Sequence, residues 1–345
     1  MPAPATRSRS GLERLDRIWR RHGRTIWIAH SIWALGTGVV VLWLAQERYD
    51  FVYWVVGFLV LTWASTLFFG RPRSIDGDDD LSARFGRGLA SYLTRVLYQE
   101  TLFFLLPFYA YSAVVPSWNV VFVALLALLA ILACLDLVFD RWLRESPVFS
   151  LVFFTSVAFG ALNLLLPTLF SIAPDIATPA AALLALASAA PLALGRRSRE
   201  RGAWLRLGAA GLAILGVALW LPQLVPPTPL RLQEVAFAAD IDRSSLEPIG
   251  AIGDGAASES LDGQLVVLAR VFAPANVPAR VSLDWYRDGA LVRSSREVEI
   301  VAHEGGFRFW DALRPDGGAV APGRYRIVLR TTDERVFGAA AVRVR

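Results

Sequence analysis

The chain contains no lysine and only one cysteine, and it is poor in charged residues of either sign. All 35 basic residues are arginine, which we attribute to genomic base composition. With Cys134 as the single thiol, neither an internal disulfide nor a cysteine-based metal site can form. Charged residues make up 19% and hydrophobic residues 55% of the chain, whereas soluble domains are about a quarter charged. This composition predicts a membrane protein.

Motifs of known enzyme classes are also missing. The sequence has no Gly-x-Ser-x-Gly elbow and no phosphate-binding loop. His303-Glu304 lacks the second histidine that a zinc metalloprotease helix requires. An intramembrane enzyme is disfavoured because no paired acid–base or nucleophile set is visible. We therefore predict a protein that is not an enzyme and that uses no cofactor and no metal.

Seven apolar segments are each about long enough to cross a bilayer as a helix, which takes roughly 20 residues. They are Ile26–Ala45, Phe51–Phe69, Thr94–Val115, Asn119–Phe139, Val148–Ile172, Thr178–Leu194 and Ala203–Leu224. The first segment follows seven arginines but lacks a small-x-small cleavage site, so we interpret it as a span and not a signal peptide. Residues 1–225 are thus predicted to form a helical bundle of about seven transmembrane helices.

The arginines between these segments predict the orientation of the chain. They gather before the first segment and in every second loop after it, and the alternate loops carry one arginine among them. Cytoplasmic loops of membrane proteins are enriched in basic residues. We expect a bacterial inner-membrane protein with a cytoplasmic N-terminus and a periplasmic C-terminal domain. Gly11–Arg21 and Leu81–Tyr92 either lie on lipid headgroups or extend the first and third spans.

Several polar residues fall within the predicted spans, where they are costly and are candidates for function. The candidate ligand or ion residues are His30, Arg95, Gln99, Glu100, Asp136 and Asn163. One interpretation is a polar pocket in which Glu100 binds a proton or cation, with His30 or Arg95 as its partner. The other is a structural set of hydrogen bonds and ion pairs that fixes the helices.

The sequence changes from helical to strand-like periodicity after the proline-rich linker at residues 225–229. Val281, Leu283 and Trp285 alternate with polar residues, and Tyr325, Ile327 and Leu329 alternate with Arg324, Arg326 and Arg330 except at Val328. Such alternation is typical of half-buried strands. We divide this part into a linker and first-strand region over residues 226–262, with the first strand at 231–241, and a domain over residues 263–345. About seven strands at this spacing predict an all-β immunoglobulin-like sandwich with Trp285 in its core.

Aromatic and cationic residues in this domain suggest a binding face. Tyr286, Arg308, Trp310 and Arg326 could together bind a glycan or an acidic polymer. The alternative is that Trp310 belongs to the core and the arginines are solvated. The domain carries 15 arginines and 16 acidic residues over residues 226–345, and this near-neutral balance gives no reason to expect nucleic acid binding.

Two stretches of the chain resemble a family of bacterial membrane proteins of unknown function. They are Gln99–Tyr109 in the membrane half and, in the β-rich half, Trp285-Tyr286 with Asp288-Gly289, Phe307-x-Phe309-Trp310 and Gly323–Arg326. The resemblance implies a multi-span N-terminal half joined to a C-terminal β-rich domain, and it implies no catalytic residues. Leu283-Asp284 stands where a histidine is common in that family, so no ligand role for that histidine applies to this chain.

These observations predict a non-enzymatic inner-membrane protein whose periplasmic β-sandwich binds an envelope protein or a glycan, for sensing or assembly. The lipid bilayer is its other expected partner. The alternative is a small transporter or channel that uses the intramembrane polar residues around Glu100. The oligomeric state does not follow from the sequence.

Overall fold

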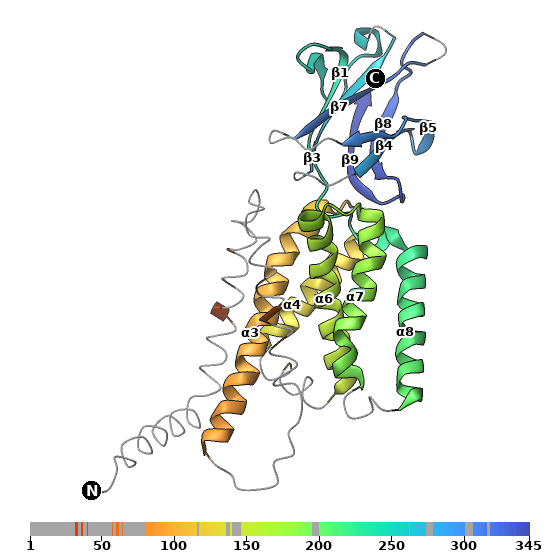
Figure 1. The fold of residues 1–345 in the computed structure, drawn as a ribbon. Coiled ribbons are helices and arrows are strands. Elements are labelled where there is room, and N and C mark those ends of the chain that lie inside the picture. The colour runs from red at the N-terminus through yellow and green to blue at the C-terminus, as the bar shows by residue number, and fades with distance from the viewer. Residues whose placement is uncertain are drawn as a thin grey trace, which may run out of the picture.

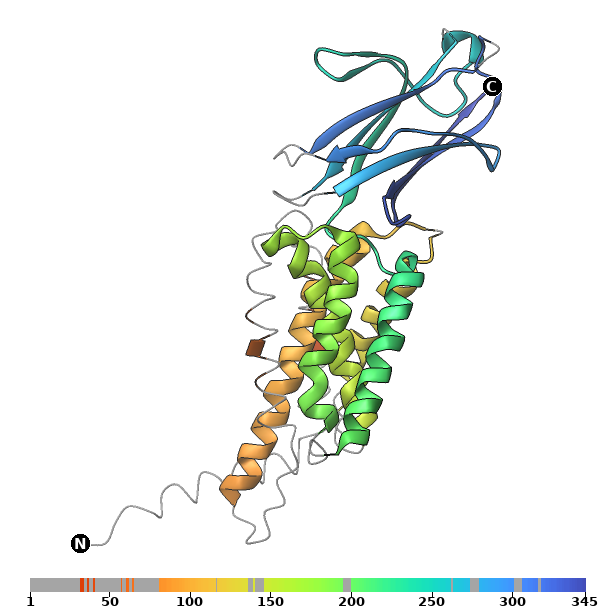
Figure 2. The same ribbon diagram turned by 45° about the vertical axis from the view of Figure 1, so that its right-hand side comes forward.

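The computed structural model describes residues 81–115, 117–135, 139, 146–194, 200–261, 263–273, 279–300, 306–315 and 318–345, with isolated positions between 32 and 64. These residues form a helical half and a β-rich half that is stacked on one end of the helices (Figure 1). Figure 2 shows the same end-on stacking in a second view. The two halves are consecutive in the sequence and meet after residue 224.

Five α-helices make up the described part of the helical half. They are α3 (Leu81–Ser112), α4 (Val120–Cys134), α6 (Pro147–Phe170), α7 (Pro174–Leu194) and α8 (Arg201–Trp220). Helices α6 and α7 form an antiparallel hairpin across the short connection at residues 171–173. Ser146 begins α6, because its side chain accepts a hydrogen bond from the backbone N–H of Phe149 at 3.1 Å. Ser171 ends α6 in the left-handed conformation, with φ of 54°.

The prediction of a seven-helix transmembrane bundle is wrong for the residues that the structure describes. Within the described part of the chain, only two helices, α6 and α7, could cross a membrane as judged by their length and composition. At 15 residues α4 is shorter than the span predicted at Asn119–Phe139 and shorter than a bilayer requires. The first two predicted spans and Gly11–Arg21 lie, apart from isolated positions, outside the described residues.

The third predicted span proved to be part of a longer helix. Helix α3 extends over 32 residues and includes both Leu81–Tyr92 and most of Thr94–Val115. Leu81–Tyr92 is therefore continuous in one helix with most of the third predicted span, as the second of the two interpretations expected. The amphipathic pattern of that segment did not distinguish the two arrangements, because both place one apolar face on a neighbouring surface.

Aromatic side chains and close helix contacts hold the described helices together. Tyr98, Phe139 and Phe153 meet edge to face, with ring centroids 4.9 to 6.2 Å apart. At Gly160 of α6 an added Cβ would lie 3.3 Å from Leu105 of α3, so these two helices approach closely at this point. Small residues at such positions allow helices to pack backbone to backbone.

The β-rich half consists of two antiparallel sheets. One has the order β2-β1-β3-β7, formed by Glu247–Ile252, Arg231–Asp242, Leu265–Phe272 and Phe307–Leu313. The other has the order β5-β4-β8-β9, formed by Ala290–Ser294, Ala279–Arg287, Gly323–Thr331 and Val336–Val344, and β6 (Val298–Ile300) also pairs with β4. The prediction of a β-rich C-terminal region is confirmed, with nine described strands where about seven were expected.

The two sheets share one apolar core, and its residues are those that alternate in the sequence. Val281, Leu283 and Trp285 of β4 are fully buried with residues of β1, β3 and β7. Trp285 contacts Phe237 edge to face at 6.3 Å, and its indole N–H donates to Asp311 Oδ2 at 2.8 Å. Tyr325 fixes the start of β8 by donating its hydroxyl to the carbonyl of Ala321 at 2.8 Å. The prediction that Trp285 is a core residue is confirmed.

Candidate functional site

The turn between β8 and β9 carries the main polar contact between the two halves of the molecule. Its residue Arg335 is fully buried, and its Nη1 donates to Thr178 Oγ1 at the start of α7 over 2.8 Å. Asp333 of the same turn forms an ion pair with Arg335 Nη2 at 2.7 Å. A guanidinium group taken out of water requires such a counter-charge and hydrogen-bond acceptors.

The hydrogen bond from Arg335 continues into the helical half. Thr178 Oγ1 donates to Asn163 Oδ1 on α6 at 2.8 Å, and Asn163 Nδ2 donates to the hydroxyl of Tyr109 on α3 at 3.0 Å. Tyr109 donates in turn to the carbonyl of Gly160 at 2.7 Å. All four side chains are buried. We call Arg335, Thr178, Asn163 and Tyr109 the interdomain chain.

Two further contacts attach the β-rich half to the helices. Asn119 Nδ2, just before α4, donates to the carbonyl of Val336 in β9 at 2.6 Å. The guanidinium of Arg231 at the start of β1 lies over the ring of Tyr111 on α3, 5.4 Å from its centroid. Residues 226–230, which connect the halves, are buried throughout. The β-rich half is therefore seated on the helices and not suspended from a solvated linker.

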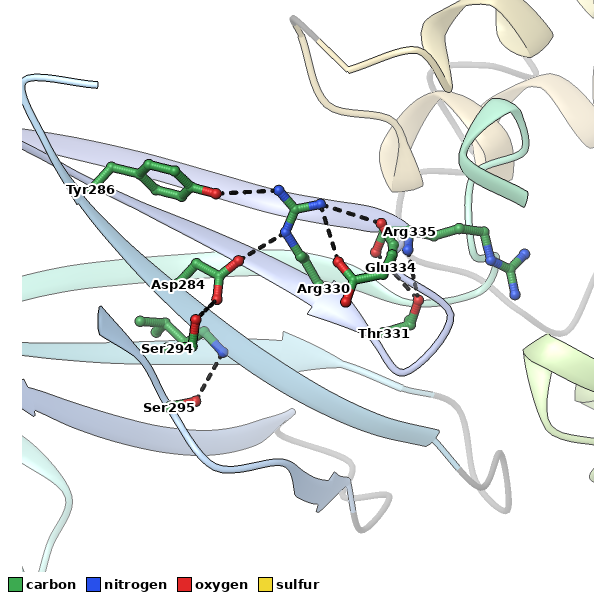
Figure 3. A network of polar contacts seen from close by, with 9 residues as sticks. Asp284, Tyr286, Ser294, Ser295, Arg330, Thr331, Glu334 and Arg335 are labelled. Atoms are coloured by element: carbon green, nitrogen blue, oxygen red, sulfur yellow. Dashed lines mark hydrogen bonds and ion pairs between the residues drawn. The ribbon is translucent and has the colours of Figure 1, made fainter. Parts of the chain in front are cut away.

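The turn that carries Arg335 also adjoins a surface network on the β-rich half (Figure 3). Arg330 Nε donates to Asp284 Oδ2 at 2.9 Å, and Arg330 Nη2 donates to the Tyr286 hydroxyl at 3.4 Å. Partial burial disfavours the charge of Arg330, but Tyr286 and Asp284 outweigh that effect and raise the pKa of its guanidinium. Glu334 lies 3.6 Å from Arg330 Nη1 in the turn itself. In Figure 3 the side chain of Arg335 points away from this network, toward the helices.

The intramembrane residues predicted from the sequence do not meet in one place. Asn163 joins the interdomain chain, whereas Arg95, Gln99 and Glu100 lie at least nine residues earlier on α3 than Tyr109, about 14 Å along the helix axis. Arg95 and Gln99 are buried and Glu100 is partly buried. His30 and Asp136 lie outside the described residues. No cluster of histidine, cysteine and carboxylate residues that could bind a metal occurs within the described ranges.

The four residues predicted as one binding face of the β-rich half lie in two sheets. Tyr286 and Arg326 are direct neighbours across β4 and β8. Arg308 and Trp310 lie on β7 in the other sheet, where the Arg243 guanidinium is 5.6 Å from the Trp310 ring centroid. Because both pairs alternate with core residues, they face away from the shared core on opposite sides. The four residues are not one site.

Three of the residues that connect the halves were not predicted from the sequence to have a role. Tyr109 and Thr178 lie in predicted apolar segments, and Arg335 was not among the candidate residues. The available signal was weak: Arg335 follows an acidic turn and is itself followed by apolar strand residues. The residues around that turn give no indication that Arg335 contacts Thr178, which lies 157 residues earlier in the chain.

The fold defines a protein with an apolar helical half and a β-rich C-terminal half seated on one end of it. The chain belongs to the Family of unknown function (DUF5924), whose model matches residues 7–263. This match includes the described helices and the strands β1 and β2. The prediction that the chain belongs to a family of unknown function is thus confirmed. The resemblance noted for residues after 263 stays a prediction. No curated protein matches the chain.

Proposed function

We propose that this is a non-enzymatic membrane protein of the bacterial cell envelope, which holds its β-rich half outside the cytoplasm to bind an envelope protein or polymer. The observation that carries the proposal is the buried contact of Arg335 with Thr178. A domain that only needed a tether would not require a guanidinium buried among helices. Rigid docking of the β-rich half instead suits a protein in which the helices sense ligand binding to that half, or one in which assembly requires that half in a fixed position.

The surface of the helices supports a location in the bilayer. Leu205 and Leu212 of α8 are 74% and 73% exposed, and Leu128 of α4 is 53% exposed. Moving a large apolar side chain from water to an apolar environment is favourable by about 1.5–3 kcal/mol. These exposed leucines would therefore be more stable in contact with lipid than in contact with water. Trp204 and Trp220 are exposed near the two ends of α8, as expected of side chains at membrane–water interfaces.

The charge of the connections supports the orientation. The sequence between α7 and α8 contains Arg196, Arg197 and Arg199, and α8 begins with Arg201. Arg201 lies at the end of the helices opposite the β-rich half, since α8 ends where the linker to β1 begins. Basic connections favour the cytoplasmic side. We infer a periplasmic β-rich half in the inner membrane.

The proposed topology is tested by cysteine labelling in spheroplasts, in a Cys134→Ala background. Leu291→Cys reports on the β-rich half, where Leu291 is 57% exposed. Arg201→Cys is the matched control, exposed at the first residue of α8 and so at the opposite end of the helices. We expect a membrane-impermeant maleimide to label Leu291→Cys in intact spheroplasts, and Arg201→Cys only after permeabilisation. The reverse pattern would place the β-rich half in the cytoplasm and refute the proposal.

A transporter with its site around Glu100 receives no specific support from the described residues. Asn163, one of its candidate residues, forms hydrogen bonds with Tyr109 and Thr178.

A further inference from the structure

Three arginines gather at the end of the β-rich half that lies away from the helices. Arg324 of β8 is directly opposite Arg343 of β9 in the antiparallel register, and Arg345 follows two residues later. Like charges directly opposite one another destabilise a sheet. All three side chains are exposed, and a hollow of about 390 Å³ lies between them and residues 254–255. We call Arg324, Arg343 and Arg345 the cationic pole.

Among the described residues, several other arginines of the β-rich half are neutralised by ion pairs with carboxylates, whereas the arginines of the cationic pole are not. Arg270, Arg293 and Arg330 form ion pairs with Glu234, Asp311 and Asp284 at 2.6 to 3.0 Å. No carboxylate in the described part of the chain forms an ion pair with a guanidinium of the pole. Asp254 lines the hollow, but its Oδ1 accepts the backbone N–H of Arg343. The side chains that line the hollow thus include three arginines and one aspartate, and Asp288 beside it accepts the backbone N–H of Arg324 at 2.9 Å.

The position of the pole indicates what can reach it. Strand β8 begins at the pole and ends at the turn that docks on the helices, seven residues later at Thr331, or about 23 Å along an extended strand. In Figure 1 the chain end at this pole is far from the helices. Headgroups of the membrane that holds the helices would therefore lie out of reach. The ligand has to be a component of the compartment that the β-rich half faces.

The exposure of the pole indicates a ligand with several negative charges. A single exposed ion contact contributes little to binding, whereas a polymer that engages neighbouring contacts at once gains affinity from each. Arg326 and Tyr286 continue the same outer face toward the middle of the sheet, so a bound chain could extend over a cationic side chain and an aromatic ring. Planar guanidinium groups bind carboxylate and phosphate in a bidentate manner.

We propose that the cationic pole binds an acidic polysaccharide of the cell envelope through the carboxylate or phosphate groups of its sugars. This names the ligand class of the proposed function and rests on the periplasmic orientation for its biological meaning. The binding itself is a property of the folded protein and can be measured independently of orientation.

The test uses the full-length protein in nanodiscs of phosphatidylcholine, which carries no net charge. Binding to polygalacturonate is measured by biolayer interferometry and compared with neutral dextran, polyglutamate and inorganic phosphate. The test variant is Arg324→Gln/Arg343→Gln/Arg345→Gln. The control is Arg280→Gln/Arg296→Gln/Arg314→Gln, which removes the same charge from exposed arginines that belong neither to the cationic pole nor to the binding face predicted from the sequence. Far-ultraviolet circular dichroism and thermal unfolding report whether each variant is folded.

We expect wild type and control variant to bind polygalacturonate within about twofold of each other, and the test variant about tenfold more weakly. Binding should weaken with salt, and dextran should not bind. Equal loss in both variants would show a general charge effect and refute the site. Polyglutamate binding as tightly as polygalacturonate, or absence of polygalacturonate binding, would refute the polysaccharide. Labelling that places Leu291→Cys in the cytoplasm would instead refute the proposed function and leave the binding result as it stands.

Discussion

At the scale of single residues, the contact between the halves depends on hydrogen bonds to a buried charge. Removing a guanidinium from water costs several kcal/mol unless other groups replace that water. Thr178 is such a group for Arg335, and it passes the hydrogen bond on to Asn163. Removing any member of the interdomain chain should therefore lower the stability by more than the net value of one hydrogen bond, because a buried polar partner is left unsatisfied.

Thr178→Val should lower the free energy of unfolding by about 1–3 kcal/mol, since it leaves Arg335 Nη1 buried without its acceptor. Thermal unfolding of the purified protein in detergent measures the effect. Thr168→Val is the control, because the Thr168 hydroxyl bonds only to carbonyls of its own helix. If both variants lose the same stability, the bond to Arg335 has no special role.

At the scale of elements, the hairpin between β4 and β5 depends on two residues with positive φ. Asp288 and Gly289 have φ of 50° and 89°, as a tight hairpin turn with the Asp-Gly sequence requires. An added Cβ at Gly289 would meet no other atom within 4 Å. The requirement for glycine at this position is therefore one of backbone conformation and not of space.

Gly289→Ala should destabilise the protein by about 1 kcal/mol, the cost of holding an L-residue in a left-handed conformation. Gly253→Ala is the matched control, because Gly253 also has open space around it and its φ is not positive. Urea unfolding followed by Trp fluorescence measures both variants. We expect the control to be neutral or slightly more stable than wild type. An equal loss in both would contradict the assignment of strain to the turn.

At the scale of the whole molecule, the structure has two halves whose relative position is fixed by a few polar side chains. Arg335 and Asn119 are the main polar ties, and the connecting residues 226–230 are buried beneath them. Interfaces of this kind allow relative motion unless they are large and apolar. Loss of the buried charge should therefore release the β-rich half without unfolding it.

Arg335→Met should broaden the distance distribution between spin labels at Leu291→Cys and Leu212→Cys, measured by pulsed electron resonance in a Cys134→Ala background. Met fills a similar volume but makes no hydrogen bond to Thr178, so the half is free to tilt. The exposed Arg280→Gln substitution is the control and should keep the narrow wild-type distribution. A narrow distribution in Arg335→Met would mean that apolar contacts alone fix the two halves.

The sequence by itself determined the features that depend on local pattern. Alternation placed Trp285 and Tyr325 in strands and in the core, and continuous apolar runs located α6 and α7, because burial imposes these periods on neighbouring residues. Composition also indicated the apolar character of the N-terminal half. The number of helices long and apolar enough to cross a membrane was not determined in this way, because apolar runs do not fix where a helix begins and ends, as α3 and α4 show.

Only the tertiary structure decided which polar residues meet. Asn163 was among the candidate residues, but its partners Thr178 and Tyr109 come from two other helices, and Arg335 comes from a turn of the β-rich half. The predicted binding face was divided between two sheets for the same reason, and Arg324 and Arg343 became neighbours through strand register. Contacts between residues far apart in a chain arise from the packing of whole elements, and no local pattern specifies that packing.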